Sequence, residues 1–108
     1  MLKISTFIKR KPGMEVEEFR RYWLEVHSKI VIKMPGIKKY IQCHTVDSAY
    51  KGGKEPIYDG MAEVWFDDMD AMRRSAQAPE YKATMADEVN FMDPASRKFI
   101  ITKEYHLI

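Results

Sequence analysis

Alternating and helical periodicities occur twice in the same order along this chain, and that order constrains the fold more than any other feature. Alternation between apolar and polar residues predicts strands, and apolar residues three or four positions apart predict helices. The expected elements are, in chain order, a strand over 2–9, a helix from about 16 to 33, strands over 37–46 and 58–66, helical segments from 69 that begin again at Pro79, and a strand over 98–108.

The order strand, helix, strand, strand, helix, strand predicts an α+β, ferredoxin-like βαββαβ domain with a four-stranded antiparallel sheet. Both helices would then cover one face of the sheet, yet the other face also carries apolar side chains on several strands. A second copy packed against that face would close the two sheets into a barrel, so we expect a homodimer with an isologous interface. A monomer with a solvated outer face is the alternative.

Length and composition exclude several classes of protein. With 108 residues, one domain spanning 1–108 is expected. No apolar run approaches the about 20 residues needed to cross a bilayer, and a net charge of +2 with scattered basic residues argues against nucleic-acid binding. Cys43 is the only cysteine and the first residues lack an apolar signal core, so we expect a cytoplasmic protein without disulfides.

His27 lies on what should be the buried face of the first helix. At 100° per residue, the apolar residues that share its arc are Val16, Phe19, Trp23, Ile30 and Met34. A buried imidazole needs a hydrogen-bond partner, and its proton affinity lies near neutral pH. His27 is therefore a candidate acid, base or ligand. The alternative is a core histidine that bonds to a backbone carbonyl.

Polar side chains recur on two of the predicted strands, where alternation places every second residue on the same face. One face of the second strand carries Tyr40, Gln42 and His44. One face of the third strand carries Asp59, Met61, Glu63 and Trp65. Ligand sites are mostly apolar with a few convergent polar groups, so this mixture suits a small hydrophobic or aromatic ligand. The predicted substrate-binding residues are Trp23, Gln42, Met61, Glu63 and Trp65.

The predicted catalytic residues are His27, Tyr40 and Asp59. His27 would remove a proton next to a carbonyl, and Tyr40 would donate a hydrogen bond to the enolate oxygen. Asp59 or Glu63 would orient the imidazole. The alternatives are that Tyr40 is an ordinary strand aromatic, that Asp59 shapes the entry to its strand, and that Glu63 pairs with a lysine across the sheet. No metal site is expected, because no histidines or cysteines have zinc-ligand spacing.

Short motifs along nearly the whole chain resemble those of the EthD family of the dimeric α/β-barrel superfamily. They are Arg10-Lys11-Pro12-Gly13-Met14, Phe19, Tyr22-Trp23, His27, Met34-Pro35-Gly36, Tyr40, Tyr58-Asp59-Gly60, Ala62-Glu63, Trp65-Phe66, Phe91 and Glu104. The resemblance implies a dimeric α/β barrel with a pocket between the long helix and the sheet.

The resemblance implies function only broadly. The family is named for a protein associated with bacterial degradation of ethyl tert-butyl ether and is grouped with oxidoreductases. Similar chains act as cyclases, dehydratases or decarboxylases on aromatic polyketides. The related methylmuconolactone isomerases carry a histidine and a tyrosine where His27 and Tyr40 stand, but they use a cysteine where this chain has Val64. That departure argues against isomerase activity of the same kind.

We therefore expect a small enzyme of aromatic, ether or polyketide-type metabolism that acts on a hydrophobic carbonyl compound without a cofactor. One alternative is a non-catalytic accessory protein that binds a hydrophobic compound for a partner oxidase. Another is a haem-binding oxidase, because other dimeric α/β barrels bind haem through a helix histidine.

Overall fold

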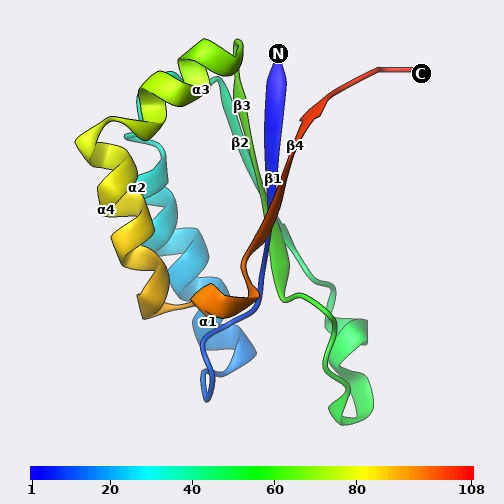
Figure 1. Cartoon of the computed structure of the whole chain (residues 1–108). Helices are drawn as coiled ribbons and strands as arrows, with labels where there is room; N and C mark the ends of the chain where they lie inside the picture. The colour runs from blue at the N-terminus through cyan, green and yellow to red at the C-terminus, as the bar shows by residue number, and fades with distance from the viewer.

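The computed structural model describes residues 1–108. It consists of a four-stranded antiparallel sheet that is covered on one face by helices (Figure 1). Its strands are β1 (Leu2–Ile8), β2 (Lys39–His44), β3 (Gly60–Phe66) and β4 (Lys98–Lys103). Their order across the sheet is β2-β3-β1-β4, with every neighbouring pair antiparallel. This arrangement confirms the predicted ferredoxin-like βαββαβ fold.

The first helical segment is not one regular α-helix. It consists of α1 (Val16–Tyr22), a π-helical turn η1 (Trp23–His27) and α2 (Ser28–Val31). The sequence predicted one regular helix to about residue 33, because a single wide turn hardly disturbs an apolar period of 3.6 residues. The extra residue of the π-turn lies between Trp23 and His27, and both of these side chains line the cavity between the helices and the sheet.

The second helical segment consists of α3 (Met69–Ala76), α4 (Pro79–Asp87) and the short turn η3 (Glu88–Asn90). The side chain of Asp68 caps α3 by accepting a hydrogen bond from the Ala71 amide at 2.8 Å, as its residue type predicts. Pro79 occupies the first turn of α4, where its missing N–H leaves no hydrogen bond unmade. The predicted restart at this proline is confirmed.

The remaining short turns are η2 (Asp47–Gly53) and η4 (Pro94–Ser96). The strands are shorter than the sequence indicated, and β4 ends at Lys103 rather than Ile108. The residues after it extend away from the sheet (Figure 1). Their alternating pattern predicted a strand, but they have no neighbouring strand within the chain to pair with.

The core fills the space between the helices and the sheet. Its buried apolar cluster consists of Ile8, Phe19, Trp23, Phe91 and Met92. Full burial of one such large apolar side chain contributes about 1.5–3 kcal/mol to stability. This cluster fixes how η1 approaches the segment that follows η3, and it contributes Trp23 and Phe91 to the lining of the cavity between the helices and the sheet.

Helices cover only one face of the sheet, and the other face is open (Figure 1). On that open face Ile41 and Ile100 are 37% and 52% exposed. Beyond the sheet, Tyr105 and Leu107 of the carboxyl-terminal segment are 76% and 90% exposed. None of the helices is both long and apolar enough to cross a membrane.

Candidate functional site

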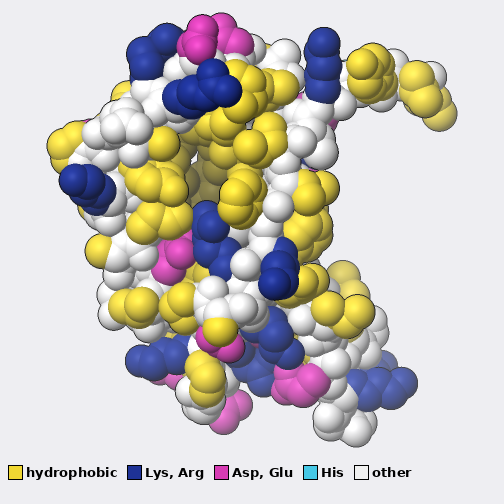
Figure 2. All heavy atoms as spheres, viewed as in Figure 1, with side chains coloured by type: hydrophobic (Ala, Val, Ile, Leu, Met, Phe, Trp, Pro, Cys, Tyr) yellow, Lys and Arg dark blue, Asp and Glu magenta, His cyan; other side chains and the backbone are white.

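A cavity of about 320 Å³ lies between the helices and the covered face of the sheet. Hydrophobic residues make up 17 of the 24 that line it, and Figure 2 shows hydrophobic side chains surrounding a hollow between the two layers. Its size and apolar lining are those of a small-molecule site. The other seven lining residues are Thr6, His27, Arg73, Ser75, Thr84, Glu88 and Arg97, and the hydroxyl of Tyr40 adds a further polar group.

His27 reaches this cavity from the end of η1 and is 5% exposed. Its Nδ1 lies 2.7 Å from Oδ2 of Asp87, at the end of α4. The other ring nitrogen, Nε2, has no hydrogen-bond partner in the protein. Burial lowers the pKa of His27 below its usual value, and the hydrogen bond to Asp87 only partly offsets that effect. The imidazole is therefore neutral at neutral pH, donates from Nδ1 and keeps a free lone pair on Nε2.

Asp87 is held by two further donors. The hydroxyl of Tyr22 donates to Oδ1 at 2.5 Å, and the amide of Asn90 donates to the same oxygen at 3.0 Å. Burial by itself raises the pKa of Asp87, but the three hydrogen bonds outweigh it and leave the pKa below its usual value. At neutral pH a charged carboxylate thus faces the neutral imidazole.

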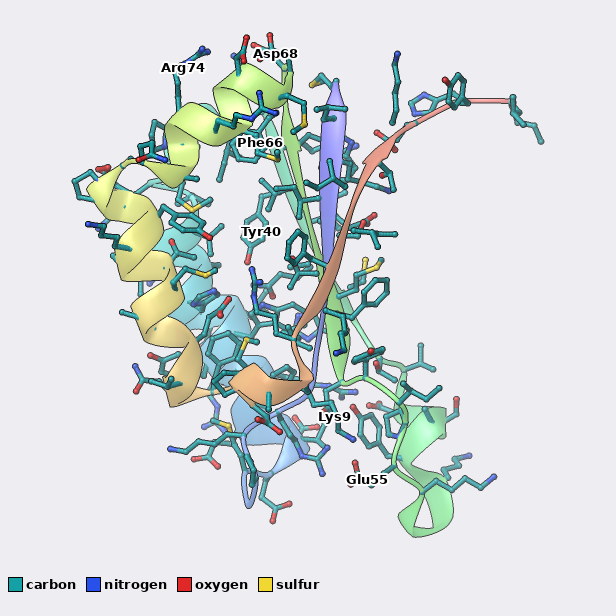
Figure 3. All side chains as sticks on the ribbon, in the orientation of Figure 1. Lys9, Tyr40, Glu55, Phe66, Asp68 and Arg74 are labelled. Carbon is teal, nitrogen blue, oxygen red and sulfur yellow. The ribbon has the colours of Figure 1, made fainter.

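Tyr40 enters the cavity from β2, and Figure 3 shows its ring pointing from the sheet into the space between the sheet and the helices. The side-chain amide of Gln42 donates to the Tyr40 hydroxyl oxygen at 2.8 Å. Because that oxygen is the acceptor, the phenolic hydrogen stays free for a ligand. Burial raises the pKa of Tyr40, so the group remains a neutral donor.

Gln42 does not line the main cavity; it faces a shallower depression behind Tyr40. Its amide nitrogen donates to the Trp23 carbonyl at 2.8 Å as well as to Tyr40, and its oxygen lies 2.9 Å from Nε2 of His44. All its polar atoms therefore have partners. Gln42 was predicted to bind substrate, but the structure places it as a support for Tyr40.

The π-turn places Trp23 as predicted, against the cavity and 1% exposed. Its carbonyl accepts from the Ser28 amide, five residues on, and also from Gln42. Gly60 on β3 makes room for the indole, since a Cβ there would lie 2.6 Å from Cη2 of Trp23. Turns of this kind are frequent at functional sites.

Asp59 is not part of this site, contrary to the prediction. It is 1% exposed and binds the Arg10 side chain at 2.7 Å and the Tyr50 hydroxyl at 2.6 Å. It also accepts from the Arg10 amide. Asp59 ties the loop before β3 to the end of β1. The carboxylate beside His27, which was predicted to be Asp59 or Glu63, is that of Asp87.

The third-strand residues Met61, Glu63 and Trp65 also lie elsewhere. Pairing of Tyr40 with Val64 puts Val64 on the covered face, so its sequence neighbours occupy the open one. Glu63 pairs there with Lys3 at 2.7 Å, and the Trp65 indole donates to Glu104. The residues of β3 that line the cavity are Ala62, Val64 and Phe66.

One carboxyl group, the half-buried side chain of Glu88, lines the cavity itself. Glu88 follows Asp87 directly, and its Oε2 accepts from Nε of Arg97 at 3.2 Å. Burial raises the pKa of Glu88, and Arg97 offsets this only in part. The helical spacing of the apolar residues in the second helical segment predicts that Glu88 and Val89 both face the core. Glu88 does line the cavity, but Val89 is 56% exposed.

Sequence reasoning missed Asp87, Tyr22 and Asn90. The only available signal for Asp87 was its spacing of three residues after Thr84 and four before Phe91, which places it on the buried side of a helix. A buried aspartate needs partners. No three of the possible metal-ligating side chains lie close enough to hold an ion.

The EthD domain model matches residues 11–95. Among solved structures, an EthD family protein from Bacillus halodurans has a TM-score of 0.78 and 20% identity, covering 97% of this chain and 99% of that chain. A dimeric ferredoxin-like protein from Thermobifida fusca has a TM-score of 0.69 and 15% identity, covering 94% and 88%.

SnoaB from Streptomyces nogalater, a cofactor-independent oxygenase, has a TM-score of 0.65 and 12% identity, covering 99% of this chain and 94% of that chain. No curated protein matches the sequence. At these identities the solved structures are similar to this chain in fold alone, whereas the domain model spans most of its length. The chain belongs to the EthD family.

Proposed function

We propose that this protein is a cofactor-free enzyme that uses His27 as a general base on a hydrophobic carbonyl compound. The observation that carries this proposal is the buried pair of His27 and Asp87 at the edge of an apolar cavity. A neutral imidazole with a free Nε2 can accept a proton, and a charged carboxylate behind it stabilises the imidazolium that forms.

The proposed step is removal of a proton from a carbon next to the carbonyl. The proton moves to Nε2 of His27, and the electron pair of the broken C–H bond forms the enolate. Tyr40 donates its free phenolic hydrogen to the oxygen on which negative charge develops. The apolar lining strengthens both interactions, because charges attract more strongly where water is excluded.

The enolate can then take back a proton, expel a leaving group or pass electrons to dioxygen. The last fate fits the family's association with oxidation, and SnoaB provides a cofactor-independent precedent on the same fold. All three fates begin with the same proton transfer. The first step can therefore be tested before the natural substrate is known.

The test is hydrogen–deuterium exchange at the methyl group of a naphthyl methyl ketone in D₂O, followed by NMR. Wild-type protein should accelerate exchange, and His27→Gln should lose about 10²-fold or more of that acceleration. His106→Gln is the matched control, because that histidine is 79% exposed and outside the cavity. Equal rates in wild type and His27→Gln would reject the base. Binding without exchange would favour an accessory protein that carries a hydrophobic compound.

We further propose that the protein is a homodimer joined through the open face of the sheet. Exposed Ile41 and Ile100 lie on that face, and an apolar surface of this kind is unfavourable in water. A related fold from Thermobifida fusca is dimeric. The partner's sheet is the occupant whose shape and apolar pattern match, since an isologous contact pairs the face with itself.

A further inference from the structure

The hydroxyl of Ser75 is buried without a hydrogen-bond partner. Ser75 lies in the last turn of α3, is 2% exposed, and its Oγ makes no hydrogen bond within the protein. It also lines the cavity. Buried polar atoms are almost always paired, and an unpaired one is unfavourable, so this atom points to a group that arrives from outside the chain.

The other serine and threonine hydroxyls in the α-helices use a partner that Ser75 does not use. Ser28 donates to the Leu24 carbonyl at 2.6 Å, and Thr84 donates to the Glu80 carbonyl at 2.9 Å. Both use the carbonyl four residues earlier, which is the usual partner of a hydroxyl within a helix. Ser75 leaves that partner unused, although the residue lines the cavity.

Ser75 and His27 lie toward opposite ends of the helical layer. Figure 1 shows α3 at one end of that layer, while α4 runs from it to the other end, beside α1. Asp87, the partner of His27, ends α4, whose nine residues span about 13 Å. The cavity thus has polar groups toward both ends, Ser75 at one and His27 at the other, within a lining that is mostly apolar.

We propose that Ser75 is a ligand-binding residue that hydrogen-bonds a second oxygen of the ligand, remote from the carbonyl at His27 and Tyr40. The ligand class is an aromatic carbonyl compound of about two fused rings with a hydroxyl or carbonyl oxygen at the far end. A volume of about 320 Å³ lies at the lower end of the range for ligand pockets, which excludes much larger ring systems. The orientation of this ligand rests on the proposed function; the hydrogen bond at Ser75 does not require catalysis.

The test measures dissociation constants for two kinds of probe by calorimetry. One is a naphthyl methyl ketone, and the others are its isomers with one hydroxyl on the distal ring. At least one hydroxylated isomer should bind wild-type protein about tenfold more tightly than the parent, the size of one net hydrogen bond. Ser75→Ala should abolish that advantage and leave the affinity for the parent ketone unchanged.

Ser28→Ala is the matched control, because it removes a helical hydroxyl that does not line the main cavity and should preserve the preference. The proposal is overturned if no isomer gains over the parent, if Ser75→Ala keeps the gain, or if neither kind of probe binds. The same measurements in His27→Gln separate the two proposals. A preference that persists in His27→Gln would support Ser75 independently of catalysis. A preference in wild-type protein that shows no deuterium exchange would support Ser75 and reject His27 as a base.

Discussion

Oδ2 of Asp87 lies 2.7 Å from Nδ1 of His27, although 60 residues separate them in the chain. Both side chains are largely buried, at 9% and 6% exposure. The contact joins the end of α4 to the π-turn, and Phe91 packs against the imidazole ring at a centroid distance of 4.5 Å. The pair fixes the tautomer of His27 and therefore which nitrogen faces the cavity.

Replacing the carboxylate should impair the base without removing it. In Asp87→Asn the side-chain amide can donate to Nδ1, which would move the imidazole hydrogen to Nε2 and block proton uptake. We expect exchange of the ketone probe to fall by about 10²-fold or more. Tyr22→Phe keeps the carboxylate and removes one of its donors, so its loss should be much smaller. Equal losses in the two variants would mean that Asp87 acts only in folding.

The pH dependence should follow the lowered pKa of His27. Exchange should rise as the imidazole loses its proton, with a midpoint below pH 6.5, the ordinary pKa of histidine. NMR titration of the ring protons of His27, assigned by comparison with His27→Gln, measures that pKa directly. A His27 pKa above 6.5 would contradict the dominance of burial over the Asp87 hydrogen bond.

Stability should depend on the same group. Because the folded protein binds the proton less readily than the unfolded chain, His27 contributes stability above pH 6.5 that is lost as the pH falls through its lowered pKa. His44 shifts in the same direction, through burial and Arg20. The free energy of unfolding, measured with urea from pH 7.5 down to about 5, should therefore fall, and His27→Gln should reduce that slope. An unchanged slope would mean that His27 has the same pKa folded and unfolded.

The helical period placed His27 and Trp23 correctly, because their neighbours in that arc are large and apolar and only one side of the helix can be buried. The same reasoning could not find Asp87 beside His27, since that contact depends on how α4 packs against η1. Alternation grouped Met61, Glu63 and Trp65 correctly but could not tell which face of β3 the helices cover. Both faces carry apolar residues, and only the pairing of Tyr40 with Val64 decides between them.

Gly60 should be intolerant of a side chain. In Gly60→Ala the new Cβ would lie 2.6 Å from Cη2 of Trp23 and 2.8 Å from the Cys43 carbonyl, so the indole or the strand must move. Overpacking of this kind costs about 1–3 kcal/mol, which urea unfolding can measure. Combining it with Trp23→Phe should cost less than the sum of the two single changes, because the smaller ring leaves room. Strict additivity would place the clash elsewhere, at the Cys43 carbonyl.

A charge on the open sheet face should separate the proposed dimer. Ile100→Lys would bury an unpaired ammonium at the interface between two copies, which is unfavourable unless they dissociate. Sedimentation velocity should show a dimer for wild type and a monomer for this variant. Val89→Lys is the matched control, since Val89 is 56% exposed in η3, outside the sheet, and should stay dimeric. A monomeric wild type, or dissociation of both variants, would contradict an interface on this face. If Ile100→Lys is monomeric but folded and still exchanges the ketone probe, the cavity is complete within one copy of the chain.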